Sequence, residues 1–464
     1  MSSILPGKYS IENQAQSNIE NFMNNFQIGK KLWNSNFKKE KGYSCIQIFK
    51  ILFMLVFIGK NLFQFLESKG SEESPEKDSF YRFLNSSRYN WRKFLLMLSS
   101  QVIKDTVSIL TSEERAKVLI IDDSVYSRSR SKTVELLANV RDHARRRYLN
   151  GFRMLTLGWS DGNTFLPLAF SLLSSKDKKN RINEINPNID KRTNGYKLRK
   201  ESVKKSTDTM FDLLDQVIPY GIPAQYLLFD SWFSFPNVIL KAMERNLHVI
   251  CMLKSMPKVF YQYMDKSMNL PKLYNYIYKK PGRAKILASV IVELGKDKNG
   301  QPVNVKIVFV RDRKNSRKWL ALLSTDTNLS EEEVIRIYGK RWDIEVFFKM
   351  TKSYLQLAKE FQGRSYDMMV AHTTIVFCRY IMLSLETRSN IDSKSFGNLF
   401  YMCCDEVKDI NFAQALFLLM DLLKRNLMEF LHLSEQRINE FLDHFIASLP
   451  AFFKNRLKIS TCES

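Results

Sequence analysis

The stretch Val118-Leu119-Ile120-Ile121-Asp122-Asp123 decides how this chain is expected to fold. Its first four residues are apolar and mostly β-branched, which is typical of a short strand buried in a core. The two aspartates follow directly. A second apolar run, Tyr226 to Phe229, also ends in an acid, Asp230. Because an acid at the end of a buried strand lies at the edge of the core, the two strand ends predict a site that can hold a cation. The alternative is that aspartate is simply common where strands end.

The surrounding sequence alternates between strand and helix patterns. A hairpin is expected over residues 152–173, with its turn at Ser160-Asp161-Gly162-Asn163. Strand patterns with basic turns fill the stretch from Pro257 to Thr325. The chain is helical in pattern before Glu113 and again after Ser330. The sequence therefore predicts an α/β fold with helical ends and a β-rich block between the second acid and the C-terminal helices.

The charge of the chain indicates a polyanionic partner. Lys and Arg number 71 against 48 Asp and Glu, which gives a net charge of +23. Such an excess favours nucleic acid first and a membrane surface second. The apolar run from Ile51 to Gly59 is too short to span a bilayer, and the run from Met368 to Leu385 is interrupted by His372 and Arg379. Both runs therefore predict core helices of a cytoplasmic protein that has no membrane partner.

The changes of pattern divide the 464 residues into five parts. Their expected bounds are 1–113 for a helical N-terminal DNA-binding region, 114–256 for the first part of an α/β core, 257–325 for a β-rich insertion, 326–390 for the second part of the core and 391–464 for a helical C-terminal region. The N-terminal helices fit either a helix-turn-helix-like unit or a plain helical cap. The C-terminal helices fit either a dimerisation region or a second cap.

A long helix is expected after Ser330, and a capping box formed by Ser330 and Glu333 marks its start. Four polar residues are spaced along this helix. With 3.6 residues per turn, all four fall within a stripe about 60° wide. They are Tyr338, Arg341, Glu345 and Lys352. A solvated helix face with an ordinary ion pair between positions i and i+4 is the alternative interpretation.

The spacing Tyr-x2-Arg-x3-Glu-x6-Lys of these residues resembles the YREK signature of the IS-four-like DDE transposase family of insertion sequences. Three further motifs resemble this family in the same order along the chain. They are residues 119–124 around the first acid, 158–167 in the hairpin and 228–232 around the second acid. The resemblance covers roughly residues 80–385, and four linked motifs argue against a chance match.

The resemblance implies an α/β fold with an RNase H-like catalytic core that is interrupted by the β-rich insertion. It also implies that Asp123, Asp230 and Glu345 are the catalytic residues and bind the metal. Asp122 competes with Asp123 for the first of these positions. The family's catalytic acid is the one directly followed by Thr or Ser, which favours Asp123 because Ser124 follows it.

The implied cofactor is a pair of Mg²⁺ ions, with Mn²⁺ as the alternative. Ligation by oxygen alone suits Mg²⁺, and the five histidines, which form no cluster in the sequence, argue against zinc. By the same resemblance Tyr338, Arg341 and Lys352 would contact DNA near the cleaved phosphate. Trp319 would stack on a flipped base, as a tryptophan of the insertion does in related family members. A core tryptophan is the competing interpretation.

The function implied by the resemblance is that of an insertion-sequence transposase. Such an enzyme cuts transposon ends in double-stranded DNA and joins the 3′ hydroxyls to target DNA, with a DNA hairpin as one route. A homodimer would hold two terminal inverted repeats together, in the cytoplasm of a prokaryote at the nucleoid. Two other functions stay open. One is an inactive DNA-binding relative that acts as an inhibitor or repressor, and the other is a stand-alone metal-dependent nuclease.

Overall fold

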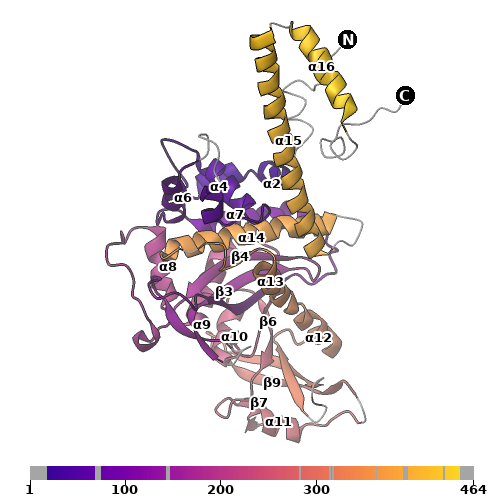
Figure 1. Ribbon diagram of the computed structural model, residues 1–464. Coiled ribbons are helices and arrows are strands. Elements are labelled where there is room, and N and C mark those ends of the chain that lie inside the picture. Colours follow the sequence, from indigo (N-terminus) through magenta and orange to yellow (C-terminus); the bar gives the residue numbers. More distant parts are fainter. Residues whose placement is uncertain are drawn as a thin grey trace, which may run out of the picture.

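The computed structural model shows a large mixed sheet with helices packed against it (Figure 1). The structure describes residues 18–67, 75–142, 147–281, 284–312, 315, 318–361, 363–389, 395–431 and 434–449. Two C-terminal helices project from this body as an arm (Figure 1). The fold is therefore α/β, as the sequence predicts.

Six strands form the first half of the sheet. They are β1 (Val118–Ser127), β2 (Ala138–Asp142), β3 (Arg147–Ser160), β4 (Phe165–Leu173), β5 (Tyr226–Phe229) and β6 (His248–Leu253). β1 pairs antiparallel with β3 and parallel with β5, and β5 pairs parallel with β6. β2 and β4 both pair antiparallel with β3. The first four residues of β1 and all four of β5 are buried, which confirms the two buried strands predicted from the apolar runs.

The predicted β-rich block continues this same sheet. Its elements are β7 (Tyr261–Tyr263), β8 (Lys266–Met268), helix α11 (Leu270–Tyr276), β9 (Ile286–Lys296), β10 (Pro302–Arg311) and β11 (Trp319–Ser324). β11 pairs antiparallel with β6, and the order runs on as β11-β10-β9-β7-β8. The block therefore covers the edge of β6, which would otherwise present unpaired backbone groups.

The N-terminal helices share one core with the sheet. They are α2 (Asn18–Asn25), α3 (Ile28–Asn34), α4 (Cys45–Met54), α5 (Leu62–Glu67), α6 (Lys77–Leu84) and α7 (Trp91–Val102). Phe49, Phe53 and Phe94 are fully buried in this common core. Arg92 of α7 forms a buried ion pair with Glu201 at 2.6 Å. These helices thus pack as a cap on the sheet.

The longest apolar helix of the body is α14 (Tyr366–Ser389). The helices α8 (Asn194–Ser202), α9 (Ser206–Val217) and α10 (Pro236–Met243) also pack on the sheet. α14 is long and apolar enough to cross a membrane, but 94% of its most apolar window is buried in the protein. Arg379 within it pairs with Glu360 at 2.7 Å and donates to the carbonyls of Leu52 and Phe53. The apolar run around this arginine is therefore a core helix, as predicted.

The single long helix expected after Ser330 is instead two helices, α12 (Glu331–Gly339) and α13 (Trp342–Ser353). The start of α12 lies where the sequence places it, because Oγ of Ser330 accepts a hydrogen bond from the backbone N–H of Glu333 at 3.1 Å. The expectation of one continuous helix is wrong.

The break between the two helices has a local cause. The backbone N–H groups of Lys340 and Arg341 bond to carbonyls three residues back, at 3.1 and 3.0 Å, which is the pattern of a tightened turn. Gly339, a poor helix former, directly precedes it. Glu345 and Lys352 still share a face, since they lie seven residues apart on α13.

The arm consists of α15 (Phe396–Leu431) and α16 (Glu435–Ser448). Its two helices enclose a small core that is separate from the core of the body, formed by Met420, Ile438, Leu442 and Ile446. Large apolar side chains of the arm stay exposed, namely Leu419, Leu422, Leu423, Met428, Phe441 and Phe445. The arm therefore projects with part of its apolar surface uncovered.

Candidate active site

The parallel pairing of β1 with β5 sets two carboxylates side by side. Ile120 lies opposite Leu228, so the same register continued by two residues puts Asp122 level with Asp230. Side chains at the same level of neighbouring strands point to the same face of a sheet. The two carboxylates are close enough to repel each other. This edge of the sheet is therefore the acidic site predicted from the two strand ends.

Arg341 joins carboxylates from two different elements. Its Nη1 donates to Oδ2 of Asp122 on β1 at 2.8 Å, and its Nη2 donates to Oε1 of Glu345 on α13. Burial works against the charge of this guanidinium, but the Tyr338 hydroxyl and the two carboxylates outweigh burial and raise the pKa of Arg341. The arginine therefore stays charged and acts as a clamp between strand and helix.

Burial raises the pKa of Asp122 to about 7, and the attraction of Arg341 offsets only part of this rise. Repulsion from Asp230 and from Asp123 adds to it. Near neutral pH the carboxyl of Asp122 therefore binds a proton unless more positive charge reaches it. A bound cation is one source of such charge.

Asp123 points to the opposite face of β1, because successive side chains of a strand alternate. Its Oδ2 lies 3.2 Å from Nη1 of Arg153 on β3. The Arg153 guanidinium lies 5.6 Å from the ring centre of Trp232, a side chain that is 46% exposed. The motif favours Asp123 as the first acid of the site, whereas the structure joins Asp122 to the helix that carries Glu345.

Tyr338 and Lys352 lie at the same site. The Tyr338 hydroxyl is buried and lacks a well-formed hydrogen-bond partner among the described residues, and burial raises its pKa. Nζ of Lys352 donates to Oγ of Ser124 at 2.5 Å. Ser124 follows Asp122 by two residues, so the two side chains lie on the same face of β1. The structure therefore gathers the four residues of the signature around the ends of β1 and β5.

The donor set of the site fits a hard cation. Asp122, Asp230 and Glu345 offer carboxylate oxygens, and Mg²⁺ takes one or two carboxylates while it keeps water or phosphate as further ligands. Within the described ranges, no three carboxylate, imidazole or thiol groups lie close enough to enclose one ion as they stand, and Arg341 bridges two of the carboxylates. The residues present fit a Mg²⁺ site once the guanidinium moves off one of them.

The position of α13 is fixed on the turn between β3 and β4. Nζ of Lys340 donates to the carbonyls of Ala116 at 2.5 Å and of Asp161 at 2.9 Å. Oγ of Ser160 donates to Oδ2 of Asp343 at 2.6 Å. Sequence reasoning does not find Lys340 and Asp343, because their partners lie about 180 or more positions away along the chain.

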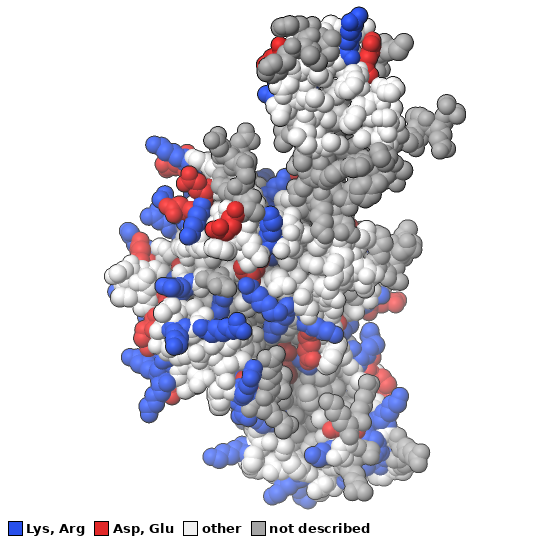
Figure 2. Space-filling model, viewed as in Figure 1, with Lys and Arg blue, Asp and Glu red and all other residues white. Residues whose placement is uncertain are grey.

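The surface around the site is basic. On the face seen in Figure 2, Lys and Arg side chains form a band across the middle of the molecule, at the level where Figure 1 shows β3 and α13. A small group of Asp and Glu side chains lies beside this band. A polyanion that approaches this face would be attracted to the band.

Trp319, expected to stack on a flipped base or to pack in a core, lies in an aromatic cluster of the insertion. Its ring stacks on Tyr274 with 4.9 Å between ring centres and meets the ring of Phe309 at 5.2 Å in an edge-on arrangement. One face of the indole is thus already occupied. The side chain as a whole is half-buried against the core, so its packing is structural while stacking on a base stays a prediction.

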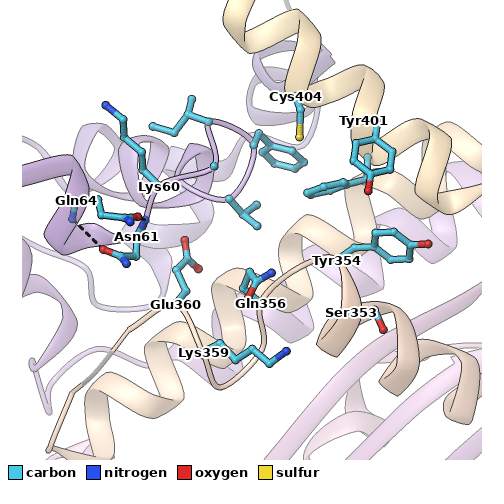
Figure 3. A pocket seen from close by; sticks show the side chains of 15 residues that line it. Lys60, Asn61, Gln64, Ser353, Tyr354, Gln356, Lys359, Glu360, Tyr401 and Cys404 are labelled. Atoms are coloured by element: carbon cyan, nitrogen blue, oxygen red, sulfur yellow. Dashed lines mark hydrogen bonds between the residues drawn. The ribbon is translucent and has the colours of Figure 1, made fainter. Parts of the chain in front are cut away.

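A separate cavity of about 530 Å³ lies between the segment that joins α4 to α5, the end of α13 with the segment after it, and the start of α15 (Figure 3). Glu360 lines it, but this carboxylate is paired with Arg379 at 2.7 Å and lies 3.3 Å from His372. The aspartates of the strand ends do not line this cavity. Its acidic group therefore serves the core, and the cavity is distinct from the candidate active site.

Two family models match the chain, and their spans include this site. The model described as a DDE superfamily endonuclease matches residues 53–274, and the model described as a transposase DDE domain matches residues 196–382. The first span contains both aspartate-bearing strand ends, and the second contains Asp230 and the helix with Glu345. Among curated proteins, no relative matches the chain.

Replacing Trp319 with Ala should lower the free energy of unfolding by about 3 kcal/mol, at the low end for removing a large packed side chain. Thermal melting measures this change. Trp33→Ala is the matched control, since Trp33 is 58% exposed, and it should melt like the wild type. A Trp319→Ala protein with an unchanged melting temperature would contradict the structural role of this ring.

Replacing Asp122 with Asn should raise the melting temperature above pH 7 when EDTA removes divalent cations. The pKa of about 7 in the folded protein lies above the ordinary value of about 4, so folding takes up a proton between these values. The contribution of Asp122 to stability therefore falls as the pH rises through this window and is least favourable above it. Asn removes a penalty on the order of a few kcal/mol.

Asp123→Asn is the control for this measurement, because Asp123 is the sequence neighbour of Asp122 and pairs with Arg153. It should show no gain in melting temperature. At pH 5 the Asp122→Asn and wild-type proteins should melt alike, since Asp122 is then protonated. A gain that appears only in Asp123→Asn would assign the destabilised carboxylate to the other aspartate.

Proposed function

Since the chain belongs to the DDE transposases, we propose that it cuts the ends of an insertion sequence in double-stranded DNA and joins the freed 3′ hydroxyls to target DNA. The observation that carries this proposal is that Arg341 joins Asp122 to Glu345, while Asp230 lies close to Asp122 at the ends of β1 and β5. The strand order β4-β3-β1-β5-β6 supports an RNase H-like core. The gathering of the YREK residues at the site supports an IS-four-like enzyme.

Two Mg²⁺ ions, with Mn²⁺ as the alternative, would bind at these carboxylates. When bound, a pair of divalent ions activates the attacking hydroxyl and stabilises the leaving oxygen of a phosphodiester. Asp230 and Glu345 would hold the ions together with Asp122, which the geometry favours over the Asp123 expected from the motif. Asp123 would then act by holding Arg153 on the other face of β1.

The remaining signature residues would bind the DNA phosphate. Arg341 can grip two phosphate oxygens with its planar fork once it leaves a carboxylate. Lys352 supplies a point charge beside Ser124, and the Tyr338 hydroxyl, protonated at neutral pH, can donate to a phosphate oxygen. On a hairpin route, Trp319 would offer a flipped base the face of its ring that Tyr274 does not cover.

The arm would join two protomers in the DNA complex. A transposase must hold two transposon ends together, and the arm presents exposed Leu419, Leu422 and Phe441 on projecting helices. Burying such side chains against a second copy is favourable, by about 25 cal/mol for each Å² of apolar surface. We therefore place the homodimer contact on α15 and α16, with the complex acting at the nucleoid of a prokaryotic cytoplasm.

The two other functions give different products. An inactive relative that represses or inhibits would bind terminal repeats without cutting them. A stand-alone nuclease would cut without joining. Incubating the protein with a donor fragment that carries both terminal repeats, and with a circular target, separates all three: a transposase yields joined product, a nuclease only cut donor and a repressor neither.

Asp230→Asn and Glu345→Gln should each lower the rate of strand cleavage in Mg²⁺, on the order of a hundredfold to a thousandfold, the effect of losing one preorganised electrostatic group. Both changes keep the side-chain volume but weaken the hold on a cation. Cleavage of a labelled donor fragment measures the rate, and a gel shift in EDTA should show unchanged DNA binding.

The first acid is tested by the same assay. Asp122→Asn should lose cleavage like the other two variants, and Asp123→Asn should retain most of it. The opposite pattern would assign the metal to Asp123. Wild-type cleavage by Asp230→Asn or Glu345→Gln would rule out the whole set.

The dimer contact is tested with Leu419→Ser combined with Phe441→Ser. Light scattering of the complex with a terminal-repeat fragment should give two protomers for the wild type and one for this variant. Ile109→Ser is the control, since Ile109 is 75% exposed on the body, and it should leave two protomers. Two protomers in the arm variant would place the contact elsewhere.

A further inference from the structure

A groove of about 1550 Å³ opens at the C-terminal end of β1, beside Asp123 and Lys352, and its lining is strongly basic. It begins at Asp123, Ser124 and Lys352 and follows two segments, residues 127–134 at and beyond the end of β1, and residues 357–359 and 363–364 after α13. Its exposed cations are Arg130, Lys132, Arg147, Lys359 and Arg364. We call this feature the basic groove. The sequence marks its position only in part, since the groove depends on segments that are far apart along the chain.

The two walls of the basic groove are bonded to each other. Both terminal nitrogens of Arg128, in the first wall, donate to the carbonyl of Phe361, which lies between the lining residues of the second wall along the chain, each at 3.1 Å. The backbone N–H of Glu135 donates to the carbonyl of Arg364 at 3.0 Å. The groove is therefore a fixed part of the fold, and a ligand does not have to order it on binding.

The basic side chains of the groove include one that is paired with a carboxylate and several that are not. Arg153 is held by Asp123 at 3.2 Å. Within the described part of the chain, Arg130, Lys132 and Arg364 make no ion pair within 4 Å, although they line one groove. Like charges so placed repel one another unless an anion lies between them. Their arrangement favours a ligand that carries several negative charges in a row.

The lining also indicates how such a ligand is bound. The lining residues include Ser, Thr, Lys and Arg but no Phe, Tyr or Trp, so the described groove offers no ring for bases to stack on. Basic and hydroxyl side chains contact the phosphates and sugars of DNA, and such contacts position the DNA without reading its sequence. A phosphate backbone therefore fits the groove better than a stack of unpaired bases.

The basic groove also reaches the candidate active site, because the two share Lys352. Lys352, which lines it, stands on α13 seven residues beyond Glu345, a distance of about 10 Å along a helix. Resting on the proposed function, we propose that the basic groove binds the sugar-phosphate backbone of the DNA strand that continues from the scissile phosphate. The signature residues hold the reacting phosphate, and Arg130, Lys132 and Arg364 hold the phosphates that follow.

The test is the salt dependence of DNA binding by Arg130→Ala combined with Lys132→Ala. The probe is a fluorescent 30-base-pair duplex of arbitrary sequence in EDTA, so that no cleavage occurs. The slope of log K against log salt is negative, and each lost phosphate contact makes it shallower by about 0.9. The slope of the double variant should therefore be shallower by about 2, and this protein should bind DNA more weakly at every salt concentration. Arg364→Gln alone should make the slope shallower by about 1.

The matched control is Lys296→Ala combined with Lys298→Ala, a pair of exposed lysines two positions apart beside the β9–β10 turn. It should keep the wild-type slope. Equal slopes for the groove variant and the wild type, or equal losses in groove and control variants, would overturn the proposal. Only variants that have the melting temperature of the wild type are compared. If the double variant melts at a lower temperature, Arg364→Gln takes its place.

Failure of the groove and failure of the proposed function give separate results. The groove variants are measured again in the Asp230→Asn background. If the assignment of the metal to Asp122, Asp230 and Glu345 is wrong, Asp230→Asn cleaves normally, yet the groove variants still show a shallower salt dependence. If only the groove is wrong, Asp230→Asn abolishes cleavage while the slope is unchanged by the groove variants.

Discussion

The guanidinium of Arg341 is the interaction on which the arrangement of the site depends. It lies between a carboxylate of a central strand, Asp122, and a carboxylate of a helix, Glu345. Burial and repulsion from the nearby Asp230 raise the pKa of Asp122 to about 7, and the attraction of Arg341 offsets only part of this rise. A lysine could not take this place equally well, because an ammonium is a point charge while the arginine fork donates to two partners at fixed angles. The site thus requires α13 to lie within reach of β1.

That requirement explains why the signature helix is broken. α12 packs against β6 and β11, whereas α13 packs against β1 and β4, and these strands lie in different parts of the sheet. The bend at Lys340 lets one segment serve both contacts. The same lysine donates to the carbonyls of Ala116 and Asp161, so the bend is held on the hairpin turn. The turn Ser160-Asp161-Gly162 therefore acts at a distance on the position of Glu345.

Features that rest on local pattern could be predicted from the sequence, and features that rest on register could not. The buried strands before Asp123 and Asp230 follow from apolar runs, and so do the β-rich block and the core helix around Arg379. The choice between Asp122 and Asp123 depends on a single step of register, because a shift of one residue moves a side chain to the other face of a sheet. No property of the dipeptide itself settles that step. The joining of the insertion to β6 and the anchoring of Lys340 are likewise contacts between distant segments.

The role of Arg341 also links metal and DNA under the proposed function. While the guanidinium binds Asp122 and Glu345, these oxygens are satisfied by one positive charge and are poorly available to a second. A DNA phosphate offers the same guanidinium an alternative pair of oxygens, and each arginine contact transferred to the phosphate releases carboxylate oxygens for a cation. Binding of phosphate and binding of Mg²⁺ should therefore favour each other, and such coupling is reciprocal. A strand held in the basic groove would bring its phosphate to Arg341, so the site would acquire its full affinity for metal only where DNA is present to be cut.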